Sequence, residues 1–245
     1  MTHKTRAIIL RAVKYGETSF VVTALTELFG LQSYMVKGVR TASKKGHGKA
    51  VMFQPGALLE MVVYHNEHKN LQFIKEYQWA EVYQHLFSGV IKNAVAMFMV
   101  ELLLKTVKQP EENPDLYHFC EDSFVALDNS TGTVTANFAL FFALHLPSLM
   151  GFQLTDNYSA ENHILDLQAG TFSGAMPEHP GYVAPPHSGV ISQLLKARIP
   201  ADTATVLLNR DTRQQLLQHM EAYYALHHSQ FGRLNTLMVL HEVLG

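Results

Sequence analysis

The first eighty residues alternate between apolar and polar positions with the two-residue period of half-buried β-strands. Stretches rich in β-branched and aromatic residues are separated by turn residues, chiefly glycine, asparagine and proline. The predicted strands are one that closes at Tyr15, then Phe20–Leu25, Leu31–Lys37, Leu58–Tyr64 and Leu71–Tyr77. Five short strands in about 75 residues predict a small closed barrel of the OB type, and an SH3-like barrel has a similar strand count.

Beyond Trp79 the period changes to that of helices. Apolar residues recur every four positions, which predicts a helix with one buried stripe, at Leu86, Val90, Ala94, Phe98 and Leu102. Further helices are predicted at 116–127, from 134 to Pro147, and at 190–199, 211–229 and 234–244. Between them, residues 155–189 are rich in glycine and proline, and the alternating piece 164–167 predicts one small strand there.

The predicted fold class is therefore α+β with two domains. Residues 1–80 form a five-stranded OB-fold β-barrel that we expect to bind nucleic acid. Residues 81–245 form an all-α helical domain with an irregular insert at about 155–189. A loop of that length is uncommon in a compact domain unless it is functional or carries local structure.

The charge is divided unevenly along the chain. The whole sequence has a net charge of −2, but residues 1–80 hold 11 basic and 5 acidic residues, whereas residues 81–245 hold 8 and 16. Such an asymmetry favours contact with nucleic acid or another anionic surface in the first part of the chain. The stretch 37–49 is basic and contains no acidic residue. A solvated loop that only keeps the domain soluble is the competing interpretation.

Motifs for common catalytic sites are absent from the sequence. Gly48-Lys49 lacks the first glycine and the final Ser or Thr of a phosphate loop, and 170–174 has the wrong spacing for a nucleophile elbow. The single cysteine, Cys120, excludes a disulfide framework and a cysteine zinc site, and is typical of a reducing cytoplasm. The apolar run 138–152 is too short for a membrane span, and Arg11 interrupts the apolar stretch that a signal peptide would need.

Fourteen histidines leave a metal site open as an alternative. His163, His179 and His187 lie in the 155–189 insert, where a metal-dependent hydrolase or transferase could place its site. Zinc ligands usually show tighter paired spacing, which favours ordinary loop histidines. Glu101 on an apolar helix is a candidate general acid, but a structural role at the edge of the stripe is favoured. A purely structural adaptor is the third interpretation.

The order of short motifs resembles that of one protein family. The motifs are Ile9-Leu10-Arg11, Tyr15-Gly16-Glu17, Gly30-Leu31, Lys37-Gly38-Val39-Arg40, Gln54-Pro55-Gly56, Glu101-Leu102-Leu103, Asn113-Pro114-Asp115, the Phe138 to Phe152 stretch and the terminal Leu240–Leu244. In this order they resemble the RecO family of bacterial recombination mediators and DNA-annealing proteins, across nearly the whole chain. Many members carry a four-cysteine zinc motif, but residues 156–189 contain no cysteine here, so we expect no metal or other cofactor.

The resemblance implies an N-terminal OB-fold followed by a helical domain, without enzymatic activity. It implies binding of single- and double-stranded DNA and annealing of complementary strands in recombinational repair. The partners it implies are RecR, the acidic C-terminal tail of single-strand-binding protein and, functionally, RecA. The location it implies is the cytoplasm, at the nucleoid.

OB barrels hold single strands by combining a positive groove with aromatic faces on which bases stack. The candidate binding residues that supply positive charge are Arg11, Lys14, Lys37, Arg40, Lys44, Lys45 and Lys49. Tyr15 and Tyr34 are the candidate stacking residues, with Phe53 as a further one, although each of these rings could instead fill the barrel. The acidic helical half suits protein contacts, and Lys92, Lys105 or Lys108 could contribute to a site for an acidic tail.

Overall fold

The computed structural model describes residues 1–39, 49–108 and 110–244. The chain divides into two compact units. The barrel unit comprises Met1–Gln84 and Val107–Val125, and the helical unit comprises His85–Thr106 and Ala126–Gly245. This division differs from the predicted boundary after residue 80, because the segment 107–125 belongs with the barrel.

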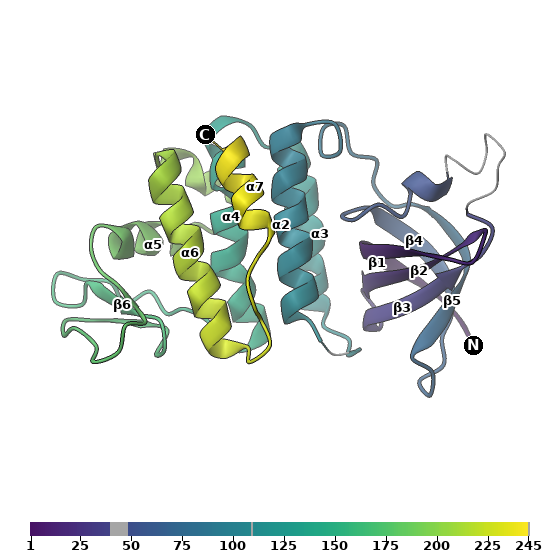
Figure 1. The fold of residues 1–245 in the computed structure, drawn as a ribbon, viewed down its shortest axis with the longest axis horizontal. Helices are drawn as coiled ribbons and strands as arrows, with labels where there is room; N and C mark the ends of the chain where they lie inside the picture. Colours follow the sequence, from purple (N-terminus) through teal and green to yellow (C-terminus); the bar gives the residue numbers. More distant parts are fainter. Residues whose placement is uncertain (40–48, 109, 245) are drawn as a thin grey trace. The chain divides into compact units, whose positions relative to one another are not determined.

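The barrel unit contains a closed five-stranded barrel with the strand order β1-β2-β3-β5-β4 (Figure 1). Its strands are β1 Thr2–Tyr15, β2 Ser19–Thr26, β3 Gly30–Val36, β4 Leu58–Tyr64 and β5 Leu71–Trp79. β3 and β5 run parallel, and the other neighbours are antiparallel. The five-stranded barrel predicted from the alternating pattern is confirmed, since each predicted strand has its counterpart.

Alternation along the strands fills the barrel interior. Phe20, Val22 and Ala24 of β2 are buried, whereas the residues between them are half-exposed. Tyr34 on β3 is fully buried and pairs with Val22. Directly paired residues of antiparallel strands share a face of the sheet, so these side chains form one continuous core.

The segment 107–125 packs closely against the barrel and carries the first part of α3 (Pro114–Asn129). The Arg6 guanidinium lies 3.0 Å from the Glu121 carboxylate, which also accepts a hydrogen bond from the Tyr117 hydroxyl at 3.2 Å. Burial raises the pKa of Glu121 and outweighs the opposite influence of Arg6. The ion pair thus joins this segment to β1, and the buried Tyr117 binds the carboxylate that makes it.

The helical unit is built around α4 (Gly132–His145), in which every residue from 137 to 144 is buried. The remaining helices are α2 Val90–Thr106, α5 His187–Leu195, α6 Arg210–His227 and α7 Thr236–Val243, with the 3₁₀ turns η1 Leu146–Met150 and η2 Pro200–Thr205. The stretch Gly132–Met150 is apolar and long enough to cross a membrane by length and composition, but 61% of it is buried within the fold. A helix that is apolar all round is typical of a protein core.

The second domain is largely helical, and its insert carries a small sheet besides. Residues 155–189 contain a three-stranded sheet of order β7-β6-β8, formed by β6 Ile164–Asp166, β7 Thr171–Ser173 and β8 Tyr182–Val183. The prediction of a small strand at 164–167 is confirmed by β6. The other two strands have two or three residues each, which is too short for a two-residue period to stand out.

Candidate nucleic-acid interface

The pairing register of the strands shows which side chains point out of the barrel. Arg11 pairs with Thr23, which pairs with Ser33. Two residues further along β1, Val13 pairs with Val21, and both side chains point out of the barrel. We call the outward-pointing residues of these strands and their edges the outer barrel face; they are Arg11, Val13, Tyr15, Ser19, Val21, Thr23, Ser33, Met35, Lys37, Tyr64, Leu71 and Phe73.

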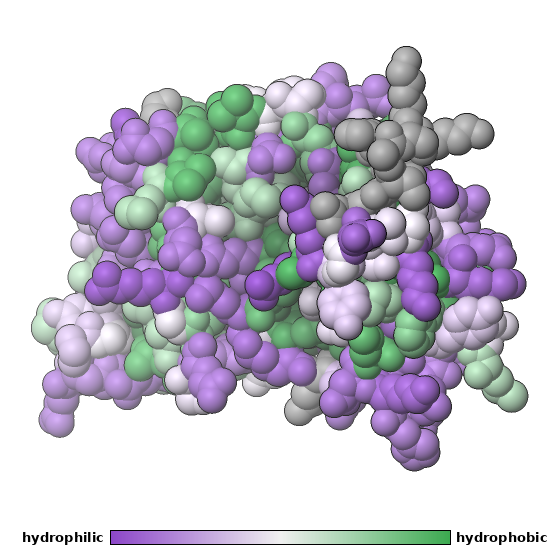
Figure 2. All heavy atoms as spheres, turned by 45° about the vertical axis from the view of Figure 1, so that its right-hand side comes forward, coloured by the Kyte–Doolittle hydropathy of each residue, from purple (hydrophilic) through white to green (hydrophobic). Residues whose placement is uncertain are grey.

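Three aromatic rings are exposed on the outer barrel face. Tyr15, Tyr64 and Phe73 are 60%, 49% and 38% exposed, and Val13, two residues before Tyr15 on β1, is 46% exposed. Phe73 pairs with Tyr64 on one side and with Met35 on the other, so the latter two flank it on the same face. Exposed aromatic rings on a sheet are the surface on which unpaired bases stack. Figure 2 shows apolar surface interspersed with hydrophilic surface on the side that carries the barrel.

Two cations that form no ion pair within the described residues also point out of the barrel. The Lys37 ammonium lies 5.6 Å from the centre of the Phe73 ring. Within the described residues, Arg11 and Lys37 have no ion-pair partner, whereas Lys4 is paired with Glu60 at 3.1 Å. Because these two cations are not neutralised by a neighbouring carboxylate, they are available to phosphates.

The structure separates the residues predicted from the sequence into three groups. Arg11, Tyr15 and Lys37 all belong to the outer barrel face, and Lys37 lies close to Phe73. Lys14 pairs with Phe20 and therefore lies on the opposite side of the sheet, while Lys49 is exposed at the start of a short turn closed by the Met52 amide, at 3.3 Å. The predicted residues outside the described part of the chain are Arg40, Lys44 and Lys45.

Tyr34 does not lie on the candidate interface. Its side chain is fully buried in the barrel, and burial raises its pKa to about 12. Phe53 is also buried, at 1% exposed. Both rings therefore belong to the core, and neither presents a face to a base. Phe73 and Tyr64 were missed by the sequence reasoning, although Phe73 stands at an alternate position of the apolar-polar pattern of its strand.

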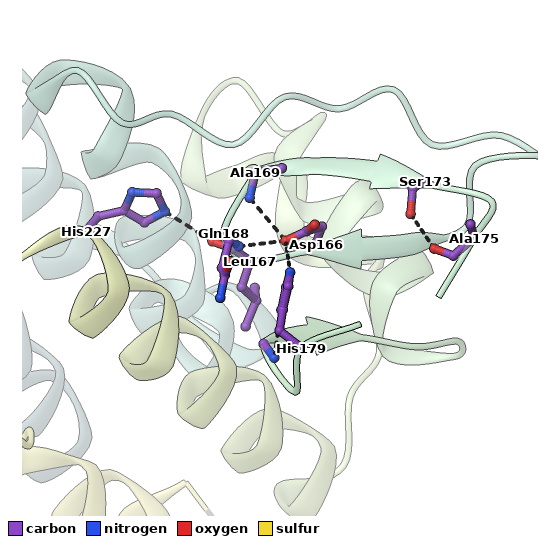
Figure 3. Close-up of polar contacts among 9 residues, drawn as sticks. Asp166, Leu167, Gln168, Ala169, Ser173, Ala175, His179 and His227 are labelled. Carbon is purple, nitrogen blue, oxygen red and sulfur yellow. Dashed lines mark hydrogen bonds and ion pairs between the residues drawn. The ribbon is translucent and has the colours of Figure 1, made fainter. Parts of the chain in front are cut away.

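The histidine-bearing insert does not bring metal ligands together. In the ranges 1–39, 49–108 and 110–244, no group of three or more His, Cys, Asp or Glu side chains could hold a metal ion. His179 lies 3.4 Å from Asp166 of β6 and accepts a hydrogen bond from the Gly181 amide, so it links β6 to the residues that precede β8 (Figure 3). His163 lies near the Ala160 carbonyl instead.

Glu101 has a structural role. Its carboxylate accepts hydrogen bonds from the backbone amides of Asn235 and Thr236, each at 2.9 Å, and from both of their side chains. Burial alone would raise its pKa, but these hydrogen bonds hold the pKa below its ordinary value. The residue thus anchors the start of α7 as an ionised group, which does not suit a general acid.

The fold and the outer barrel face define a binding protein built on a five-stranded barrel joined to helices. Residues 1–83 match the family model described as "Recombination protein O N terminal", and residues 88–234 match "Recombination protein O C terminal". The chain belongs to the RecO family of DNA repair and recombination proteins, which are non-enzymatic mediators. The alternative of a metal-dependent hydrolase or transferase is therefore wrong.

Relatives named DNA repair protein RecO match along their whole length. The chain is 35% identical over 244 residues to the protein of Christiangramia forsetii, covering 98% of each chain. It is 32% identical over 246 residues to that of Bacteroides fragilis and 31% identical over 248 residues to that of Flavobacterium psychrophilum, with 99% of each chain covered. The resemblance inferred from the ordered motifs is thus confirmed.

Proposed function

We propose that this protein binds DNA through the outer barrel face and anneals complementary strands. The observation that carries the proposal is the combination, on the outside of the barrel, of three exposed aromatic rings with Arg11 and Lys37, two cations that form no ion pair within the described residues. Cations that follow a backbone and rings that accept bases are the two parts of a single-strand site in an OB barrel. The cations also serve double-stranded DNA, because its phosphates offer the same charge.

Annealing needs charge neutralisation more than chemistry. Two strands repel each other through their phosphates, and a basic face that holds one strand lowers this repulsion for the next. Stacking and phosphate contacts do not distinguish one base sequence from another, so the face accepts any strand. Sequence-neutral binding is what annealing of arbitrary complementary strands requires.

We further propose the protein partners that family membership suggests. These are RecR, the acidic C-terminal tail of single-strand-binding protein and, functionally, RecA, which the protein helps to load on coated DNA. The helical unit is the acidic part of the chain and suits protein contacts better than DNA contacts. The proposed location is the cytoplasm, at the nucleoid, where these partners and the DNA are found.

A salt titration tests the proposed interface. The double variant Arg11→Ala, Lys37→Ala is compared with wild type for binding of a labelled oligothymidylate between 50 and 300 mM salt, alongside a strand-annealing assay. Each lost phosphate contact lowers the slope of log affinity against log salt by about 0.7, so we expect a decrease of about 1.4 and slower annealing.

The matched control is Lys4→Ala on the same barrel. Lys4 is paired with Glu60 at 3.1 Å, so its charge is already neutralised and its loss should leave the slope unchanged. Equal slopes for wild type and the double variant would contradict the proposed face.

A further inference from the structure

The loop between β4 and β5 is held in shape from inside the barrel. Gln72, which is 2% exposed, donates hydrogen bonds from its amide nitrogen to the backbone carbonyls of Asn66, at 2.9 Å, and Lys69, at 2.6 Å. Its amide oxygen accepts one from the Asn66 backbone amide at 2.9 Å. A buried side chain with three bonds to one short loop fixes the path of that loop, and with it the position of the exposed Lys69.

This loop forms one wall of a polar pocket of about 370 Å³ in the barrel unit. The other walls come from β2, β3 and the segment 107–125. Its lining residues are Thr23, Leu31, Gln32, Ser33, His65, Glu67, Lys69, Asn70, Gln72, Lys108 and Pro110. The lining contains two lysines and one carboxylate, together with the hydroxyls of Thr23 and Ser33. This composition suits an anion.

The charge of the pocket is set by its lysines and Glu67. His65 stacks on Phe29 with ring centres 3.9 Å apart, and burial lowers its pKa, with the neighbouring His3 acting in the same direction. The imidazole is therefore neutral at neutral pH and adds no charge. Within the described residues Lys69 has no ion-pair partner, so its ammonium remains available to a ligand.

The pocket is continuous with the outer barrel face. Thr23 and Ser33 pair with each other, belong to that face and also line the pocket. Lys37 stands four residues further along the chain from Ser33, which corresponds to about 13 Å at the rise of a β-strand. A nucleic-acid strand lying across Lys37 and Phe73 therefore continues toward Lys69.

We infer that this pocket binds a backbone phosphate of the DNA strand that crosses the outer barrel face. Lys69 supplies the charge, and the hydroxyls of Thr23 and Ser33 supply hydrogen-bond donors to the same phosphate. Gln72 positions the loop that carries Lys69. The inference rests on the proposed function and extends it, since it assigns one phosphate of the bound strand to a preformed site.

The first test uses two variants, one that removes a positive charge from this loop and one that removes a negative charge. Lys69→Ala should weaken binding of oligothymidylate several-fold at 50 mM salt and lower the salt slope by about 0.7. Glu67→Gln removes the pocket's carboxylate and should strengthen binding at the same salt. Wild-type affinity and slope in both variants, with the Arg11→Ala, Lys37→Ala slope still reduced, would overturn the pocket and leave the proposed function standing. Absence of DNA binding by the wild-type protein would overturn both.

A double-mutant cycle then tests whether the lysine and the hydroxyl serve one phosphate. Thr23→Val removes only the hydroxyl and keeps a β-branched residue in the strand, so it should weaken binding without changing the salt slope. If both groups hold one phosphate, the Thr23→Val, Lys69→Ala variant should lose less affinity than the product of the two single losses. Strict additivity would place the two groups on different phosphates and overturn the inference. Thermal unfolding of each variant confirms that the fold is retained.

Discussion

Two tyrosines on neighbouring parts of the barrel show how pairing decides the role of a residue. Tyr15 pairs with Ser19 in an outward row and is 60% exposed, whereas Tyr34 pairs with Val22 in an inward row and is fully buried. Their chemistry is identical, and both are candidates from the sequence. A shift of one residue in register exchanges the two faces of a strand, so the face of a given ring follows only from the pairing.

At this scale we predict a loss of stacking without a loss of charge. Tyr15→Ala and Phe73→Ala should each weaken single-strand binding by about 1–3 kcal/mol while leaving the salt slope unchanged, because a ring holds a base and not a phosphate. Fluorescence titration of an oligothymidylate at several salt concentrations measures both quantities. Tyr158→Ala is the control, since that ring is as exposed as Phe73, at 38%, but lies in the helical unit. If Tyr158→Ala weakened single-strand binding as much, the stacking role of Tyr15 and Phe73 would be contradicted.

At the scale of elements, the strands and long helices followed from the sequence because their periods extend over many residues. The short strands β7 and β8 did not, and neither did the membership of the segment 107–125. That segment is placed by contacts distant in the sequence, such as the ion pair of Arg6 with Glu121. Gly30 meets the same segment at another residue. Its φ is +56°, and a Cβ atom there would overlap the backbone of Glu111. No local pattern encodes such an approach.

We predict that Gly30→Ala destabilises the barrel unit more than an equally strained glycine elsewhere. Gly16 has a similar φ of +58°, but a Cβ atom there meets nothing within 4 Å. Gly16→Ala should cost about 1 kcal/mol of unfolding free energy from backbone strain alone, and Gly30→Ala about 1–3 kcal/mol more because the 107–125 segment must shift. Denaturant unfolding followed by fluorescence of Trp79, the single tryptophan, reports on β5. Equal losses for the two variants would contradict the close packing.

At the scale of the whole molecule, the charge asymmetry of the sequence is less simple than it first appears. Residues 107–125 bring one lysine and five acidic residues to the barrel unit, so that unit holds 12 basic and 11 acidic residues. Its net charge alone does not explain binding of DNA. Within the described residues Arg11 and Lys37 have no acidic partner, whereas Lys4 is paired with Glu60 and Arg6 with Glu121. The sequence predicts that the N-terminal part of the chain is basic, and the fold determines where each of its cations lies.

The central claim is that the outer barrel face of the barrel unit holds the single strand. Photo-crosslinking of the full-length protein to oligonucleotides containing 5-iodouracil, followed by mass spectrometry of the crosslinked peptides, tests it directly. We expect crosslinks at Tyr15, Tyr64 or Phe73 with oligonucleotides of unrelated sequence, and their loss as salt rises. Crosslinks confined to peptides of the helical unit, or crosslinks that depend on the base sequence, would contradict the account.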